Sequence, residues 1–229
     1  MNRDRAQPRP WQTDWLMLRG MRRTFDRLAE AHLRNGLTLL DFGCGDQPYR
    51  QLVQAHGTTY IGADFGDAAE VRISPEGIVA APDASVDVVL SVQVLEHVRD
   101  LDLYFAEIDR VLKKDGTLLL STHGTWLYHP HPEDHRRWTR TGLVHDIEAR
   151  GFTVREIEAI VGPLATTTMI RLTGFAFMLR RIPLVGGGIV AMLSMVMNAR
   201  GWVEELMTPA TIKNDNGCIY VTSCVKAAA

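Results

Sequence analysis

The sequence predicts an α/β fold: a doubly wound, mostly parallel sheet with helices on both faces. Short apolar runs alternate with longer segments in which apolar residues recur at helical spacing, and this alternation favours a parallel sheet. Gly43 and Gly45 follow the first apolar run, at the edge where such a sheet binds ligands. The 229 residues, 46% of them hydrophobic, can bury one core without a disulfide or a metal.

The N-terminal region is expected to form a loose arm and then one helix. Residues 1–10 are polar and basic. Apolar side chains such as Leu18 and Phe25 recur at helical spacing across residues 11–33, and Asn35-Gly36 marks the end of this helix.

The rest of the chain alternates strands and helices. Apolar runs too short for helices predict strands at residues 37–42, 60–64, 71–73, 86–92, 117–121, 153–158 and 218–225. Helical spacing predicts helices at residues 48–55, 102–112 and 141–150, the second of them closed by residues 113–116. The chain then divides into an arm and helix (1–35), a ligand-binding core (36–161), an apolar helical insertion (162–210) and the last strand, which completes the core sheet (211–229).

Composition excludes several classes of protein. A net charge of −2 argues against a dedicated nucleic-acid binder, which would carry a basic excess. The three cysteines form no CxxC pair, and the N-terminus lacks the apolar core of a signal peptide, so a cytoplasmic location is expected. The longest uncharged run, residues 182–197, contains Pro183 and is shorter than the roughly 20 apolar residues of a spanning helix.

The turn after the first strand predicts the kind of ligand. Asp41 precedes the two glycines and Asp46 follows them, so a pyrophosphate would be repelled and a cationic ligand attracted. Pro48 stands where a dinucleotide fingerprint needs its third glycine, and the Gly-Lys-Ser/Thr ending of a phosphate loop is absent. A plain strand-to-helix turn is the alternative.

A second acidic position ends the second strand. Asp64 lies twenty-one residues beyond Gly43, where a carboxylate can accept hydrogen bonds from both hydroxyls of a ribose. Phe65 could then pack on an adenine. The alternatives are a cap or turn aspartate for Asp64 and a core aromatic for Phe65.

These motifs resemble those of the class I S-adenosylmethionine-dependent methyltransferases. The resemblance runs through residues 41–45, Asp64, 82–89, 95–98 and 107–116 in the family's order. It implies a Rossmann-like methyltransferase fold with seven strands, the last one antiparallel. It also implies S-adenosyl-L-methionine as cosubstrate.

The resemblance assigns roles to residues of this chain. Asp41, Gly43, Cys44, Gly45, Asp64 and Phe65 would hold the cofactor, Ser91 and Val92 would edge its methionine part, and His97 would lie near the methyl group. A structural hydrogen bond is the alternative role for His97. The chain departs from the family at residues 74–81, where many relatives carry an acidic residue and Leu-Pro; Gly77 or Ile78 could contact adenine there.

A histidine-rich loop, residues 122–139, follows the fifth strand. His129 and His131 are expected to face the acceptor and, with His97, to orient or deprotonate it. The loop's Pro-x-Asp-x-x-Arg-x-Thr pattern resembles a subgroup that acts on glycan or lipid-linked substrates; there Asp134 and Arg137 would brace the loop. No metal site is expected, because Pro130 and Pro132 hold the first histidines in extended backbone and no second ligand cluster exists.

The apolar insertion has three open interpretations. It could be a helical lid over the acceptor, an interfacial membrane element through residues 170–200, or a homodimer interface. Arg171, Arg180, Arg181 and Arg200 flank its apolar residues, and methionines suit all three roles.

The sequence therefore predicts a methyltransferase that acts on a small-molecule, sugar or lipid-linked acceptor. An oxygen nucleophile fits the histidines best, although the acceptor itself cannot be determined from sequence. The alternatives are an NAD-dependent oxidoreductase of the same sheet class and a non-catalytic, membrane-peripheral binding module.

Overall fold

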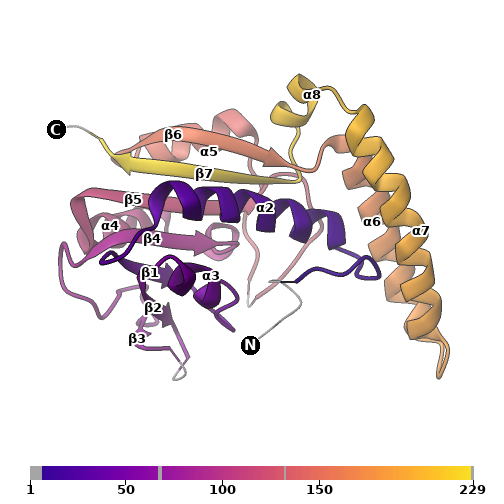
Figure 1. Ribbon diagram of the computed structural model, residues 1–229, viewed down its shortest axis with the longest axis horizontal. Coiled ribbons are helices and arrows are strands. Elements are labelled where there is room, and N and C mark those ends of the chain that lie inside the picture. Colours follow the sequence, from indigo (N-terminus) through magenta and orange to yellow (C-terminus); the bar gives the residue numbers. More distant parts are fainter. Residues whose placement is uncertain (1–6, 67–68, 132, 228–229) are drawn as a thin grey trace.

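A computed structural model describes residues 7–66, 69–131 and 133–227. Its seven-stranded sheet has the order β3-β2-β1-β4-β5-β7-β6, with helices on both faces (Figure 1). The strands are β1 (Thr38–Phe42), β2 (Thr59–Asp64), β3 (Val71–Arg72), β4 (Val86–Val92), β5 (Leu112–His123), β6 (Phe152–Ile160) and β7 (Ile219–Lys226). Because β7 runs antiparallel to both neighbours while the other pairs are parallel, the sheet is mixed, as expected.

Helices fill the connections between the strands. They are α2 (Trp15–His32), α3 (Arg50–Ala55), the short 3₁₀ helix η1 (Leu95–His97), α4 (Leu101–Val111), α5 (Arg140–Glu148), α6 (Pro163–Leu179), α7 (Gly186–Met207) and α8 (Ala210–Asp215). Alternating strand residues serve two cores: Leu39 packs in the cluster with α2, whereas Leu40 packs in the cluster with α4 and α5. Both faces of the sheet are therefore covered.

The order of the strands places the candidate site. The chain leaves β1 toward β2 on one side, whereas β4 lies on the other side of β1. Ligands of open α/β sheets bind beyond the carboxyl ends of the strands at such a switch point. The turns that follow β1, β2, β4 and β5 meet at this edge.

The predicted helix closure at residues 113–116 is wrong. These residues belong to β5, which begins directly at the end of α4. Leu112 pairs with Val86 but Thr117 pairs with Val88, so the intervening residues form a bulge. The bulge carries charged side chains, and Lys113 donates a hydrogen bond to Asp87 at 2.8 Å.

The end of the predicted N-terminal arm contacts α7. Residues 1–6 lie outside the described part of the chain. Beyond them, the Asn198 side chain of α7 donates to the carbonyls of Pro10 and Gln12 at 2.7 and 2.8 Å. The helix that follows begins at Trp15, later than the periodicity predicted.

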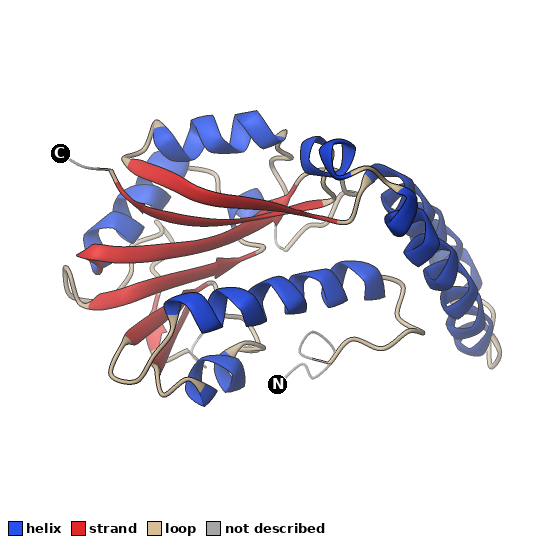
Figure 2. Cartoon of the chain, turned by 45° about the horizontal axis from the view of Figure 1, so that its top comes forward, coloured by secondary structure: helices blue, strands red, loops and turns tan. Residues whose placement is uncertain are grey.

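Helices do connect β6 to β7, where an apolar helical segment was predicted. α6 and α7 form an antiparallel hairpin that extends past the edge of the sheet (Figure 2). Thr173 and Phe177 of α6 line a cavity described below.

Candidate functional site

The turn after β1 is shaped by its glycines. Gly43 and Gly45 have φ of 74° and 48°, which L side chains rarely adopt. A Cβ on Gly43 would lie 2.6 Å from Val94 Cγ2, so this position also excludes a side chain by contact. The amides of Gly43 and Cys44 both donate to the Ala63 carbonyl of β2, at 2.8 and 3.1 Å, and this holds the turn against the neighbouring strand.

Asp41 is a buried carboxylic acid at the end of β1. It is 2% exposed, and the Tyr60 hydroxyl donates to its Oδ2 at 2.5 Å. Burial raises the pKa of Asp41 to about 7, with the charge of Asp64 adding to the effect and the Tyr60 hydrogen bond opposing it. Near neutral pH this carboxyl can therefore lose its proton when a cation binds beside it.

Asp64 joins the turns that follow β1 and β2. Its Oδ2 accepts the Gly45 amide and its Oδ1 accepts the Phe65 amide, both at 2.7 Å. It therefore braces the glycine turn, as the turn-aspartate alternative proposed, and it remains exposed enough to accept further hydrogen bonds. Phe65 is 58% exposed, so its interpretation as a core aromatic is wrong and its ring is open to a ligand.

The first cavity opens over this turn and has a volume of about 230 Å³. Its lining contains five predicted cofactor residues and three others: Asp41, Gly43, Cys44, Gly45, Val92, Asp46, Pro48 and Tyr49. A Cβ added to Gly45 would have no other atom within 4 Å, so the main chain there borders open space. An acidic cavity with bare main chain fits a ligand that carries an ammonium and a sulfonium.

The side chains of Ser91 and Cys44 are buried and already engaged or protonated. Ser91 is fully buried on the face of β4 that packs against α4, where the Tyr104 hydroxyl donates to its side chain at 2.6 Å. Cys44 is 3% exposed, and burial raises the pKa of its thiol to about 12. Any cofactor contact of these two residues is left to their main chains.

A second cavity, of about 200 Å³, lies beside the first, and Tyr49 lines both. Three parts of the chain enclose it: α2 with the residues before it, the loop after β5, and α6. Its lining is largely apolar, with Met17, Leu18, Met21, Trp126 and Phe177 among its members. This cavity suits an acceptor held next to the cofactor.

Gln93 stands at the carboxyl end of β4 and lines the second cavity. Its φ of 58° is unusual for a residue other than glycine. The main-chain N–H of Gln93 donates to the Ser121 carbonyl at 3.0 Å, and its side-chain Nε2 donates to the Ser121 hydroxyl at 3.3 Å. Strain of this kind, held by a neighbouring strand, is common at functional sites.

The structure brings the three predicted catalytic histidines together. The ring centroids of His129 and His131 lie 4.5 Å apart, and that of His97 lies 5.8 Å from His129 and 6.3 Å from His131. Only His129 of the three lines the second cavity. Burial lowers the pKa of His129 to about 4, and the neighbouring histidines add to the effect, so this ring is neutral at pH 7.

The His97 ring makes a structural hydrogen bond through one of its two nitrogens. Its Nδ1 donates to the Glu133 carbonyl at 2.5 Å, which ties η1 to the loop after β5. The adjoining Pro132, one of the prolines expected to extend this loop, lies outside the described residues.

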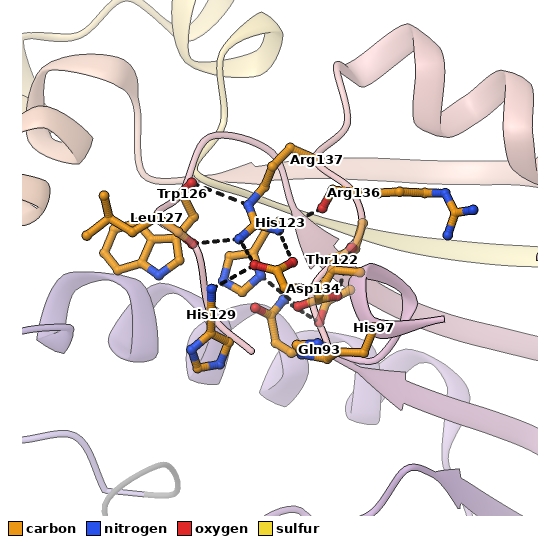
Figure 3. Close-up of polar contacts among 12 residues, drawn as sticks. Gln93, His97, Thr122, His123, Trp126, Leu127, His129, Asp134, Arg136 and Arg137 are labelled. Atoms are coloured by element: carbon orange, nitrogen blue, oxygen red, sulfur yellow. Dashed lines mark hydrogen bonds and ion pairs between the residues drawn. The ribbon is translucent and has the colours of Figure 1, made fainter. Parts of the chain in front are cut away.

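A fourth histidine, which the sequence did not single out, is paired with a buried carboxylate at the second cavity. His123 ends β5 and lies among the polar contacts of this site (Figure 3). It lines the second cavity and is 2% exposed. Its Nδ1 lies 2.6 Å from Oε1 of Glu96, and the Thr122 hydroxyl donates to Glu96 Oε2 at 2.9 Å. Burial alone would raise the pKa of Glu96, but the hydrogen bond from His123 holds it below its usual value.

This ionised partner fixes the tautomer of His123. Nδ1 must donate to the carboxylate, which leaves Nε2 as the acceptor nitrogen of the ring. The Trp126 ring lies nearly parallel to the imidazole, with an interplanar angle of 8° and centroids 6.3 Å apart. The sequence signal for this pair was a histidine at the end of a strand and a glutamate beside His97, and neither was distinctive alone.

Asp134 and Arg137 shape the loop, as predicted for a brace. Arg137 meets both carboxylate oxygens, at 2.5 and 2.6 Å, and donates to the Trp126 and Leu127 carbonyls (Figure 3). Asp134 also accepts the His129 amide at 2.7 Å. Burial would raise the pKa of Asp134, but these donors lower it to about 2, so the pair stays charged at neutral pH.

No group of three or more His, Cys, Asp or Glu side chains within the described ranges has the arrangement of a metal site.

Comparisons with known proteins point to one family. A family profile described as a methyltransferase domain matches residues 15–157. A probable S-adenosylmethionine-dependent methyltransferase of Mycolicibacterium smegmatis is 29% identical over 143 residues, which cover 55% of this chain and 56% of that protein. A ubiquinone biosynthesis O-methyltransferase of Brucella anthropi is 30% identical over 103 residues, 38% of this chain and 42% of that protein. The chain spans about half the length of the curated relatives it matches.

A solved structure shows the same fold over nearly the whole chain. The putative sarcosine dimethylglycine methyltransferase from Galdieria sulphuraria has a TM-score of 0.60 at 13% identity, covering 92% of this chain and 88% of that one. At this identity the likeness concerns the fold alone.

Proposed function

Because the chain belongs to the class I S-adenosylmethionine-dependent methyltransferases, we propose that it transfers the methyl group to a hydroxyl oxygen of a small-molecule, sugar or lipid-linked acceptor. S-adenosyl-L-methionine is its cosubstrate, which leaves the dinucleotide alternative without support. The observation that carries the choice of oxygen is the Glu96–His123 pair at the second cavity. The O-methyltransferase name of one relative agrees with this choice.

The first cavity provides what the cofactor needs. The Asp41 and Asp46 carboxyls face a cationic ligand, and Asp64 is available to ribose hydroxyls beside the glycine turn. The exposed ring of Phe65 is suited to cover an adenine. When bound, the cofactor supplies a methyl group already activated by its positive sulfur, which departs as a neutral thioether.

The second cavity provides the base that a hydroxyl requires. An alcohol or phenol becomes a good nucleophile only as it loses its proton, whereas an amine is already nucleophilic. His123 Nε2 takes this proton while the oxygen bonds to the methyl carbon. The buried Glu96 carboxylate then stabilises the imidazolium that forms, because the pair carries opposite charges 2.6 Å apart in a site of low dielectric.

The neutral His129 has a different role in this proposal. With a pKa of about 4 it is a weak base at pH 7, but its ring can donate or accept a hydrogen bond. We therefore assign it, with His97 and His131 behind it, to orienting the acceptor. Orientation in line with the methyl carbon supplies much of the rate enhancement in such a transfer.

A labelled-methyl assay tests the proposal. The purified protein is incubated with methyl-labelled cofactor and fractionated cell lipids and glycans, and labelled products are treated with mild alkali and with acid. Alkali-stable methyl ethers are expected. Label found only in base-labile methyl esters or on nitrogen would contradict the assignment of an oxygen nucleophile with a histidine base.

A further inference from the structure

The α6–α7 hairpin is attached to the core mainly at the end where α6 begins and α7 finishes, although Thr173 and Phe177 of α6 also line the second cavity. Near that end, Gly201 of α7 faces Leu16 of α2, and a Cβ on Gly201 would lie 2.6 Å from Leu16 Cδ1. The other end, around residues 180–188, extends away from the sheet in both views (Figures 1 and 2). Near this distal end, each helix therefore packs mainly against the other helix.

The packing of α7 is inverted relative to a helix of a water-soluble core, whereas α6 buries Met169 and Leu172. The residues that α7 buries are mostly small or polar: Gly186, Val190, Ser194, Asn198 and Gly201. Its large apolar side chains instead form an exposed stripe at helical spacing: Met192, Met195, Val196, Trp202, Val203 and Leu206. Soluble helices bury the apolar stripe. Helices that pack against each other in lipid place small residues between them and apolar ones outside.

The hairpin carries positive charges except at its attached end, where α7 contains Glu204 and Glu205 and Glu204 pairs with Arg200. Residues 163–203 contain four arginines and no aspartate, glutamate or lysine, although the whole chain has a net charge of −2. Arg171, Arg180 and Arg181 are exposed, and none of the three forms an ion pair with any residue that the structure describes. Arg180 and Arg181 directly precede the tip, where Leu184 is fully exposed.

We infer that the α6–α7 hairpin docks on an anionic membrane surface. The tip and the exposed stripe of α7 would enter the boundary between headgroups and acyl chains, and the arginines would meet lipid phosphates. Across the described segments, no helix is long and apolar enough to cross a membrane, so the contact is interfacial. Since Thr173 and Phe177 of α6 line the second cavity, the same contact brings that cavity close to the lipid.

Vesicle sedimentation tests this inference with charge variants. The protein is expected to bind vesicles of phosphatidylcholine with phosphatidylglycerol, and to bind phosphatidylcholine alone much more weakly. Neutralising two surface cations, in the double variant Arg180→Gln/Arg181→Gln, should weaken binding about 30-fold. The matched control is Arg23→Gln/Arg155→Gln, which removes the same charge from exposed positions on α2 and β6 and should leave binding unchanged.

Two apolar variants test the stripe. Leu184→Asp and Val196→Glu change exposed side chains, so both should fold and both should lose vesicle binding. Circular dichroism checks the fold, and light scattering checks the oligomeric state.

Three outcomes would overturn the inference: no binding to anionic vesicles, equal loss in the control pair, or a wild-type dimer that Val196→Glu separates. The last would assign the stripe to a second copy of the chain. These readouts do not depend on the proposed function, because cofactor affinity and methyl transfer are measured separately on the same proteins.

Discussion

Glu96 Oε1 and His123 Nδ1 lie 2.6 Å apart, and both side chains are almost completely buried, although they come from different turns of the switch-point edge. Glu96 is carried by η1 after β4, and His123 ends β5. An ionised carboxylate with no solvent around it needs a donor, so the pair fixes both the tautomer and the orientation of the imidazole.

Replacing His123 should remove the base without removing the cofactor site. His123→Gln is expected to lower kcat about 10²- to 10⁴-fold, the range for one general base, while calorimetry shows cofactor affinity unchanged. Glu96→Gln should lower kcat less and shift the acid limb of the pH–rate profile to lower pH, since the imidazolium loses its counter-charge. A purely structural pair would lower the amount of folded protein and leave the profile of the remainder in place.

Asp64 should contribute measurably to cofactor binding. Asp64→Ala leaves a ribose hydroxyl and the amides of Gly45 and Phe65 without their acceptor, and it should weaken binding by about 1–3 kcal/mol. Asp115→Ala, which removes an exposed carboxylate distant from the cavity, is the control for the change in charge. Titration calorimetry measures both, and equal affinities for the two variants would remove Asp64 from the site.

The raised pKa of Asp41 predicts a pH dependence for cofactor binding. At pH 6 most of this carboxyl is protonated, because its pKa is about 7, and above pH 8 most is ionised. A cationic ligand favours the ionised form, so affinity should rise between pH 6 and 8 and binding should release protons. Calorimetry in buffers of different ionisation enthalpy measures that release, and Asp41→Asn should abolish it.

The raised pKa of Asp41 also predicts that the unliganded protein becomes less stable as the pH rises. The unfolded carboxyl ionises near 3.8, whereas the folded one keeps its proton until about 7, so the native state binds more protons in between. Stability from this group is therefore lost as pH rises through that window. Urea unfolding at pH 5 and pH 8 should show a larger decrease for the wild type than for Asp41→Asn.

The sequence could predict the sheet and the glycine turn because their signals are local. Buried strands show as apolar runs, and positions such as Gly43 must accommodate a backbone that other residues avoid. The second cavity could not be predicted in this way, because α2, the loop after β5 and α6 meet there from distant parts of the chain. For the same reason His123 remained unnoticed: its role depends on Glu96, twenty-seven residues away.

The Asp134–Arg137 pair should hold the histidine loop in place. Arg137→Lys keeps the charge but cannot meet two carboxylate oxygens and two carbonyls at once, so we expect a loss of about 1.5–3 kcal/mol in unfolding free energy. Arg99→Lys changes an exposed pair with Glu133 and should cost much less unfolding free energy. Urea unfolding compares the two, and the KM for the acceptor should rise only for Arg137→Lys. Similar losses for both variants would show that Arg137 is not a specific brace.

Gly43 and Gly36 offer a matched test of the turn. Both have positive φ, 74° and 84°, so an alanine at either position has to adopt a conformation that L residues avoid. Only at Gly43 would the added Cβ also contact another side chain, 2.6 Å from Val94 Cγ2, whereas at Gly36 it would meet nothing within 4 Å. Gly43→Ala should therefore lose about 1–3 kcal/mol more unfolding free energy than Gly36→Ala. Adding Val94→Ala should restore part of that difference, because it removes the contact; a double variant no more stable than Gly43→Ala would place the strain in the backbone alone.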